Sequence, residues 1–130
     1  MTQTDVEEWL DRFVHSALAR DLERHMGMIS RDVLVFGVPG FDSLEYADWY
    51  RQCEHEFPQG LLTHLSYEQV RLRLATDDRV LFKAIETTGT RDGSRTRQGV
   101  EIMLQREAGT WRLKQLRLLA EEEMRHVGLA

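Results

Sequence analysis

Apolar residues recur at helical spacing over the first part of the chain. Over residues 5–20 they stand three and four positions apart, which predicts an amphipathic helix with one buried stripe. A shorter second helix is predicted over residues 21–29, with Asp21 as its N-cap. A third helix is expected over residues 43–57, with an apolar face rich in aromatic residues. That face consists of Tyr46, Trp49, Tyr50, Cys53 and Phe57.

The hydrophobic period changes to two in the second half of the chain. A short strand is expected over residues 33–38, before the third helix. After that helix, runs of strand-forming residues separated by Asp and Gly turns predict three or four long antiparallel strands. The candidate segments are residues 66–76, 79–90, 94–107 and 110–120.

The alternation also predicts which side chains face inward. On the first long strand, Val70 and Leu72 are expected to face the core, which leaves Tyr67 on the outer face. The same period turns Glu68 inward, and on the next strand it turns Glu86 inward. We therefore expect acidic side chains to converge near one end of the sheet.

The order of elements, helices first and strands later, indicates an α+β protein with helices packed on one face of a bent antiparallel sheet. The length of 130 residues suits one domain over residues 1–130. We expect its core over residues 5–119. The charged tail over residues 120–130 is expected to be a short helix or disordered.

Composition narrows the class of protein. The net charge of −5 gives no global support for binding nucleic acid. Apolar runs are too short to cross a membrane, and the acidic start of the chain does not resemble a signal peptide, so a cytoplasmic protein is expected. The single cysteine, Cys53, excludes an intrachain disulfide and a cysteine-rich metal site.

Two stretches carry a resemblance to a known family. These are "ALARDLERHMGMISRDVLVFGVPG" and "TRDGSRTRQGVEIMLQREAGTWRLKQLRL". Their order and spacing resemble the nuclear transport factor 2-like superfamily, in its SnoaL-like and ketosteroid isomerase-like branch. The resemblance implies a cystatin-like cone, with three N-terminal helices packed on a strongly curved antiparallel sheet and a pocket at the open end. Many members of the superfamily are homodimers through the outer face of the sheet.

The same resemblance argues against isomerase chemistry. The positions that match the isomerase base, its tyrosine and its protonated aspartate are here Gly37, Phe13 and Ile102. None of these side chains can transfer a proton, which that reaction requires within about 3 Å of the substrate. The resemblance therefore implies the cone and its pocket without the isomerase residues.

Glycine and proline mark a corner after the first strand, at Gly37, Pro39 and Gly40. We expect this corner to form the rim of the pocket. The glycines either let the strand bend and approach a neighbour closely, or leave space for a ligand at the mouth.

The pocket wall is expected to combine the helix stripe, the aromatic helix face and the inner face of the sheet. An aromatic stripe at helical spacing more often forms a core than a binding site, but in this fold the core and the pocket lining are continuous. The pocket is expected to bind a small, largely apolar molecule. The expected ligand-binding residues are Phe13, Ala17, Phe36, Trp49, Tyr50, Phe57, Leu72, Phe82 and Ile102.

Three titratable residues are candidates for catalysis, namely Glu68, Glu86 and His64. A carboxyl group half-buried beside aromatic rings would have a raised pKa and could act as a general acid or base. The other histidines in helices, His25 among them, are interpreted as partners in surface ion pairs. No metal site and no cofactor are expected, because Cys53 and His55 point to different sides of a helix.

Three functional interpretations follow. The first is a protein that binds a small apolar molecule. The second is an enzyme, such as a cyclase, dehydratase or hydrolase acting on a polyketide- or terpenoid-like molecule, with Glu86 or Glu68 as its acid or base. The third is a non-catalytic dimerisation module with a filled pocket. A homodimer is expected through the outer sheet face, at residues Tyr67, Leu81, Ile85 and Met103.

Overall fold

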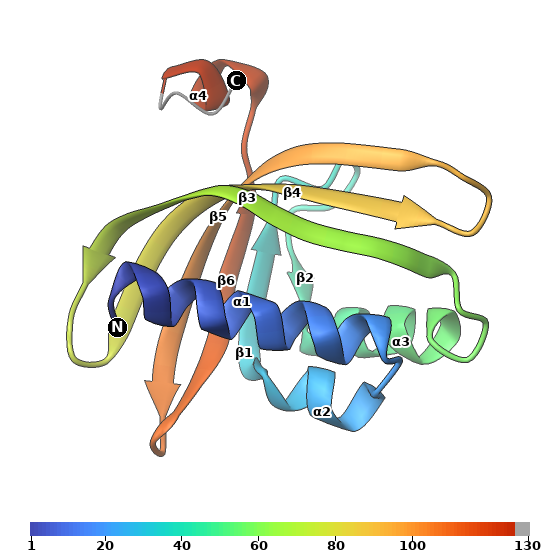
Figure 1. Ribbon diagram of the computed structural model, residues 1–130, viewed down its shortest axis with the longest axis horizontal. Helices are drawn as coiled ribbons and strands as arrows, with labels where there is room; N and C mark the ends of the chain where they lie inside the picture. Colours follow the sequence, from blue (N-terminus) through green and yellow to red (C-terminus); the bar gives the residue numbers. More distant parts are fainter. Residues whose placement is uncertain (127–130) are drawn as a thin grey trace.

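The computed structural model describes residues 1–126 and contains the three expected N-terminal helices followed by long strands (Figure 1). The helices are α1 (Gln3–Leu18), α2 (Leu22–Gly27), α3 (Tyr46–Glu56) and α4 (Glu121–His126). The strands are β1 (Ile29–Phe36), β2 (Leu44–Glu45), β3 (Leu62–Ala75), β4 (Arg79–Thr90), β5 (Arg95–Glu107) and β6 (Thr110–Leu118). No helix in this described part is long and apolar enough to cross a membrane.

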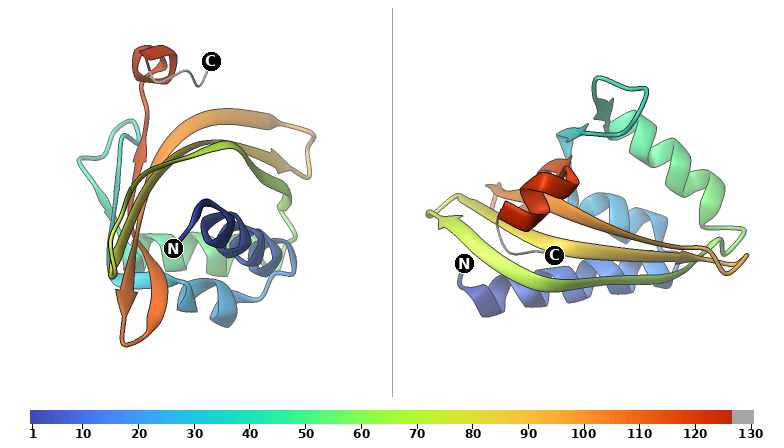
Figure 2. Two further views of the ribbon diagram at one scale, coloured as in Figure 1. Left: turned by 60° about the vertical axis from the view of Figure 1, so that its left-hand side comes forward. Right: turned by 90° about the horizontal axis from the view of Figure 1, so that it is seen from above.

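The six strands form one sheet in the order β2-β1-β6-β5-β4-β3. Neighbouring strands are antiparallel except β1 and β6, which run parallel. The sheet curves strongly, and α1, α2 and α3 lie on its concave side (Figure 2). The expected α+β architecture with helices on one face of a bent sheet is therefore confirmed.

Helix α1 fills the concave face because its apolar stripe meets the sheet. The Thr2 hydroxyl caps the helix by accepting a hydrogen bond from the Asp5 N–H, and the Asp5 carboxylate accepts one from the Thr2 N–H. The indole N–H of Trp9 donates to the Trp111 carbonyl at 3.1 Å. Burial of this stripe fixes the helix across the sheet. Its buried residues are Val6, Trp9, Leu10, Phe13, Ser16 and Ala17.

The corner after β1 requires glycine at residue 37 for two reasons. Gly37 has φ +91°, which side chains rarely adopt. A Cβ atom there would also come within 2.9 Å of the Leu118 carbonyl oxygen on β6. The close approach of two backbones, and not space for a ligand, therefore explains this glycine.

Strand β3 contains a bulge that reverses its alternation. Gln69 has φ +53°, and the pairing with β4 shifts between Glu68 and Arg71. An extra residue moves the side chains before it to the other face of the sheet, as far back as a second shift between Leu62 and His64. Tyr67 consequently faces inward, although the regular alternation predicted it on the outer face, and Glu68 faces outward instead of inward.

Helix α4 packs on the convex face of the sheet, opposite the other helices (Figure 1). Its Met124 packs against Ile85 and Leu119, directly over Gly99. A Cβ atom on Gly99 would come within 2.5 Å of Met124, so the methionine side chain can pack here only because residue 99 has no side chain. The tail is therefore a helix over its described part, and residues 127–130 of the expected tail lie outside the described residues.

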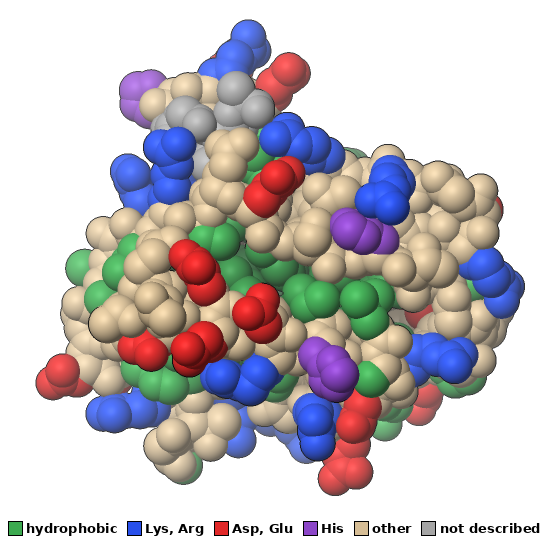
Figure 3. Space-filling view, viewed as in Figure 1, with side chains coloured by type: hydrophobic (Ala, Val, Ile, Leu, Met, Phe, Trp, Pro, Cys, Tyr) green, Lys and Arg blue, Asp and Glu red, His purple; other side chains and the backbone are tan. Residues whose placement is uncertain are grey.

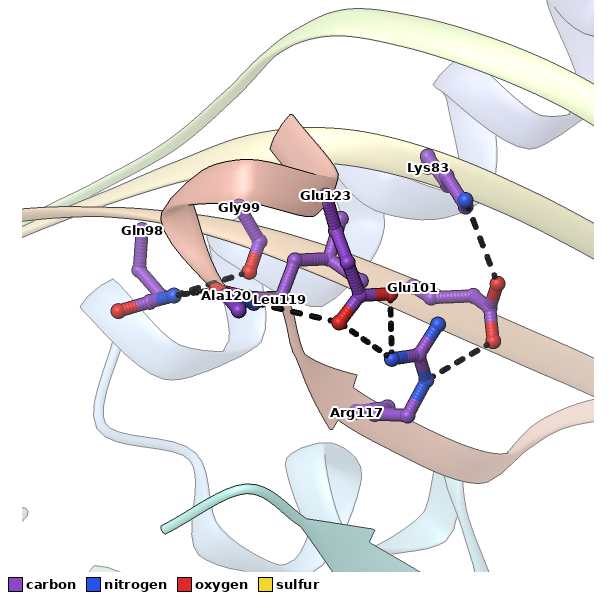
Figure 4. Close-up of polar contacts among 8 residues, drawn as sticks. All are labelled: Lys83, Gln98, Gly99, Glu101, Arg117, Leu119, Ala120 and Glu123. Carbon is purple, nitrogen blue, oxygen red and sulfur yellow. Dashed lines mark hydrogen bonds and ion pairs between the residues drawn. The ribbon is translucent and has the colours of Figure 1, made fainter. Parts of the chain in front are cut away.

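A row of charges holds α4 to the sheet. Arg117 on β6 donates to both carboxylate oxygens of Glu123 on α4, at 3.0 and 2.8 Å. The same guanidinium lies 3.4 Å from Glu101, which also lies 3.9 Å from Lys83 (Figure 4). The contact between Arg117 and Glu123 is the shortest link in the row, and one guanidinium nitrogen is shared between both carboxylate oxygens.

The helix changes the surface that was expected to form a dimer. Ile85 is fully buried beneath α4, and Tyr67 faces the inside of the cone. Leu81 and Met103 remain partly exposed on the convex face, where they are direct cross-strand partners. Two of the four expected interface residues are therefore unavailable there.

Candidate functional site

A pocket of about 530 Å³ lies between the second half of α1, helices α2 and α3, and the concave face of the sheet. Its apolar lining consists of Phe13, Ala17, Val35, Val38, Phe41, Leu44, Trp49, Cys53, Phe57, Leu62, Leu65 and Leu116. Its polar lining consists of His25, Asp48, Arg51, Gln52, Glu56, Tyr67, Glu86 and Thr88. The wall is apolar overall, as is usual for pockets that take small organic molecules.

The corner after β1 contributes to the rim of this pocket. Val38 and Phe41 line it, and the Phe41 side chain is 60% exposed. An exposed phenylalanine at a pocket mouth offers apolar surface that a ligand would cover.

The structure brings some of the expected lining residues together and separates others. Phe13, Ala17, Trp49 and Phe57 line the pocket. The remaining five, which are Phe36, Tyr50, Leu72, Phe82 and Ile102, do not line it.

These five residues lie elsewhere for identifiable reasons. Phe82 and Ile102 are fully buried cross-strand partners in the middle of the sheet, and Leu72 packs beside Phe82. Phe36 follows Val35, and consecutive residues of a strand face opposite sides, so only Val35 reaches the pocket. Tyr50 instead stacks with Tyr46 in a separate surface groove.

Glu86 is the carboxyl group that the sheet contributes to the pocket, and it is paired with Tyr67. The two residues are direct cross-strand partners, and the Tyr67 hydroxyl donates to Glu86 Oε2 at 2.6 Å. Burial raises the pKa of Glu86, although the bond from Tyr67 acts in the opposite direction. Burial, together with the nearby Glu86 carboxylate, also raises the pKa of Tyr67 well above its ordinary value. Glu86 is thus suited to hold and exchange a proton.

The other two candidate residues for catalysis lie away from the pocket. Glu68 is exposed on the outer face, because of the bulge, and lies 3.7 Å from Arg97. His64 shares a hydrogen bond with the Ser66 hydroxyl at 3.0 Å and does not line the pocket. Only Glu86 of the three therefore meets the apolar wall.

His25 is a pocket residue that the sequence pattern did not single out. It is 3% exposed and shares a hydrogen bond with the buried Ser16 hydroxyl at 2.9 Å. Burial lowers the pKa of His25 to about 4, while the Phe13 carbonyl acts in the opposite direction. The expected surface ion pair with Asp21 is wrong, because Asp21 caps α2 through the Arg24 N–H and His25 turns inward.

Cys53 also lines the pocket, but its thiol is not activated as a nucleophile. Burial raises the pKa of its thiol to about 12, and the nearby Glu56 carboxylate acts in the same direction. A neutral thiol is a poor nucleophile. Within residues 1–126, no three His, Cys, Asp or Glu side chains gather in a way that could hold a metal ion.

A second, smaller groove of about 420 Å³ runs between α1 and β3. Figure 3 shows apolar side chains exposed along this part of the molecule, close to acidic ones. Leu10 and Val14 line the groove together with the exposed carboxylates of Glu7 and Asp11. Exposed carboxylates keep ordinary solvation, so the larger pocket is the better site for binding or chemistry.

Comparisons with known proteins agree with this architecture. A family model described as a SnoaL-like domain matches residues 6–118. No curated protein sequence matches the chain.

Several solved structures are similar over most of the chain. An NTF2-like protein of unknown function from Pseudomonas putida KT2440 has a TM-score of 0.73 and 13% identity, covering 91% of this chain and 85% of that one. A protein from Novosphingobium aromaticivorans DSM 12444, with a provisional assignment as a scytalone dehydratase, has a TM-score of 0.69 and 12% identity, covering 87% and 79%. The association domain of CaMKII from C. elegans has a TM-score of 0.72 and 11% identity, covering 91% and 95%. At these identities the likenesses show the fold alone, which is the NTF2-like, cystatin-like fold.

Proposed function

The chain belongs to the SnoaL-like domain family, and on that premise we propose that its pocket binds a small, largely apolar molecule and holds one polar group of that molecule at Glu86. The observation that carries this proposal is the Glu86 carboxyl group, half-buried on the concave face of the sheet and hydrogen-bonded to Tyr67, in a wall that is mostly apolar. An apolar pocket with few, well-placed polar groups is the usual form of a ligand site.

The Glu86 carboxyl has one oxygen to offer a ligand. Tyr67 occupies Oε2, and Oε1 has no partner among residues 1–126. Gln105 Oε1 is the one completely buried side-chain oxygen or nitrogen there without a partner, so Glu86 Oε1 reaches the pocket surface. This oxygen accepts a hydrogen bond when the carboxyl is ionised and donates one when it is protonated.

Binding is tested with small aromatic ligands and two matched variants. Because Trp49 lines the pocket, its fluorescence reports occupation. We expect Glu86→Gln to weaken binding of an aromatic ligand with two hydroxyl groups, such as 2,6-dihydroxynaphthalene, about tenfold, the size of effect that one hydrogen bond in an apolar site produces. Glu68→Gln is the control, since Glu68 lies on the outer face, and it should leave binding unchanged.

Either of two results would contradict this assignment. Binding that survives Glu86→Gln unchanged would remove Glu86 from the site. Absence of binding by any member of a broad set of apolar aromatic molecules would favour the alternative of a dimerisation module.

A second candidate function is catalysis of proton transfer, such as a dehydration. The specific observation in its favour is that Glu86 combines a raised pKa with a place in the pocket wall, as a general acid or base requires. The similar structure with a provisional assignment as a scytalone dehydratase makes an elimination the first reaction to assay. A cyclase or hydrolase would use the same carboxyl. Activity that disappears in Glu86→Gln and persists in Glu68→Gln would support this candidate.

We also propose that two copies of the chain associate through the convex face of the sheet. A row of direct cross-strand partners crosses five strands there, and it is largely apolar. The row consists of Leu34, Gln115, Met103, Leu81 and Leu74. Leu34 and Leu74 are 37% and 53% exposed, which gives a partner apolar surface to cover.

A further inference from the structure

His25 holds a second polar position in the pocket, separate from Glu86. Its ring lies 4.5 Å from the Phe13 ring, 5.6 Å from Phe57 and 6.5 Å from Trp49, measured between ring centroids. The imidazole is thus surrounded by aromatic rings, and no charged side chain makes an ion pair with it within residues 1–126.

The neighbouring hydroxyl determines which ring nitrogen carries the proton. The Ser16 oxygen lies 2.8 Å from the Phe13 carbonyl oxygen and 3.9 Å from Met28 Sδ, and we assign its single proton to the carbonyl, which can only accept. The Ser16 oxygen also lies 2.9 Å from His25 Nδ1, so that bond needs a proton from the imidazole. The proton balance therefore assigns the Nδ1–H tautomer, with a free lone pair on Nε2.

The Nε2 atom opens into the pocket. It has no hydrogen-bond partner among residues 1–126. It is also not among the completely buried atoms without a partner, of which Gln105 Oε1 is the one example there, so it reaches an accessible surface. The cavity that His25 lines is the pocket between α1, α2, α3 and the sheet.

The charged residues of the pocket wall make no hydrogen bond or ion pair with Nε2 of His25, so this atom is available to a ligand. Asp48 and Arg51 on α3 make an ion pair with each other at 2.6 Å, which satisfies both. Glu56, also on α3, and Glu86 on β4 contribute the remaining carboxyl groups of the lining. Apart from these, His25 meets aromatic and apolar groups, so an acceptor without a partner stands in an apolar wall.

We infer that Nε2 of His25 accepts a hydrogen bond from a hydroxyl group on a flat aromatic ligand, and that this selects hydroxylated ligands over their ethers. The inference rests on the proposed function, because it requires that the pocket binds a small molecule. The ring of such a ligand would lie against Phe13, Trp49 and Phe57, where stacked and edge-to-face contacts are available. Ser16 is a positioning residue, since it fixes the tautomer without meeting the ligand.

The test compares 2-naphthol with 2-methoxynaphthalene, which lacks the donor, by titration of tryptophan fluorescence and by calorimetry. The wild-type protein is expected to bind 2-naphthol about tenfold more tightly, the size of effect that one hydrogen bond in an apolar site produces. His25→Phe keeps an aromatic ring in place and should bring the two affinities to a ratio near one. Ser16→Ala should reduce the preference while leaving the affinity for the ether unchanged.

A second measurement does not depend on any variant. The ¹⁵N spectrum of the histidine side chains should show Nε2 of His25 as the unprotonated nitrogen, and its resonance should move when 2-naphthol is added. The Nε2–H tautomer, or a resonance that does not move when 2-naphthol is bound, would overturn the inference.

The outcomes separate this inference from the proposed function. If neither compound binds, the proposed function and the inference both fail. If the wild-type protein binds both compounds equally, or if His25→Phe keeps the preference for 2-naphthol, the pocket binds ligands but His25 does not select them.

Discussion

At the scale of single residues, burial shifts the pKa of His25 and the pKa of Glu86 in opposite directions, and the physical cause is the same for both. An apolar wall favours the neutral form of each group, so it lowers the pKa of the imidazole and raises that of the carboxyl. The imidazole becomes a dependable acceptor at neutral pH, and the carboxyl retains its proton to a higher pH. One pocket thus offers two polar groups of different character.

The lowered pKa of His25 predicts a loss of stability in acid. Between its ordinary value of 6.5 and its folded value of about 4, the unfolded chain binds more protons at this residue than the folded chain. Stability contributed by His25 is therefore present above pH 6.5 and is lost as the pH falls towards 4. The shift corresponds to roughly 3 kcal/mol at most.

This loss is measured by chemical denaturation of matched variants between pH 4 and 7. His25→Gln should show a shallower fall of unfolding free energy with acid than the wild-type protein, because glutamine does not titrate. His55→Gln is the control, since His55 is exposed on α3. Glu86 affects the free energy of unfolding in the opposite direction, because its pKa is raised: the stability that it contributes is lost as the pH rises above 4.5. This contribution is the same in all three proteins. An unchanged slope in His25→Gln would contradict the prediction.

The sequence located some of these residues and missed others for physical reasons. Glu86 lies on a strand whose alternation is regular, so counting by two placed it on the inner face. Tyr67 was assigned to the wrong face because one residue in β3 breaks that alternation. His25 stands four residues after Asp21, and this spacing is typical of both an ion pair and a capped helix with a buried side chain. Which of the two forms depends on aromatic rings from distant parts of the chain.

At the scale of elements, the bulge in β3 decides what the pocket contains. The strand keeps its place in the sheet on both sides of Gln69, but the residues that face inward have even numbers after the bulge and odd numbers between Leu65 and Tyr67. Val70 and Leu72 follow the predicted alternation, whereas Leu65 and Tyr67 replace Ser66 and Glu68 at the pocket. Glutamine carries no strong signal for a positive φ, so the sequence did not reveal this bulge.

Substitution of Gln69 tests the role of its backbone conformation. A β-branched residue is disfavoured at φ +53°, so Gln69→Val is expected to lower the free energy of unfolding by about 1–2 kcal/mol. Gln69→Gly, which relieves this strain, should be neutral or slightly stabilising. Thr87→Val is the control in β4, whose pairing with β5 has no register shift and where valine suits a strand. Equal effects of valine at both positions in denaturant unfolding would contradict a strained residue at 69.

At the scale of the whole molecule, the two faces of the sheet differ in what packs against them. The concave face, with α1, α2 and α3, forms the pocket. The convex face is partly covered by α4, and the apolar row through Met103 and Leu81 lies beside this helix. The order of helices and strands was enough to predict the bent sheet. The packing of α4 over Gly99 depends on a contact between distant residues that no local sequence pattern reveals.

The proposed dimer predicts the mass of the protein in solution. Sedimentation equilibrium should give twice the mass of the chain for the wild-type protein and the mass of one chain for Met103→Glu, which places a charge in the apolar row. Leu18→Glu is the control, because Leu18 is 40% exposed on α1, away from the convex face. A wild-type monomer, or a dimer that persists in Met103→Glu, would remove this row from the interface.

The bulge at Gln69 has one more consequence, for the solubility of the fold. Strand β3 is the last strand of an unclosed sheet, so it presents one row of backbone groups to other chains. A regular, flat edge of fourteen residues would invite strand addition and aggregation. The bulge bends this edge near its middle, between the charged side chains of Glu68 and Arg71. The irregularity that brings Tyr67 to Glu86 therefore also protects the molecule from joining its copies edge to edge.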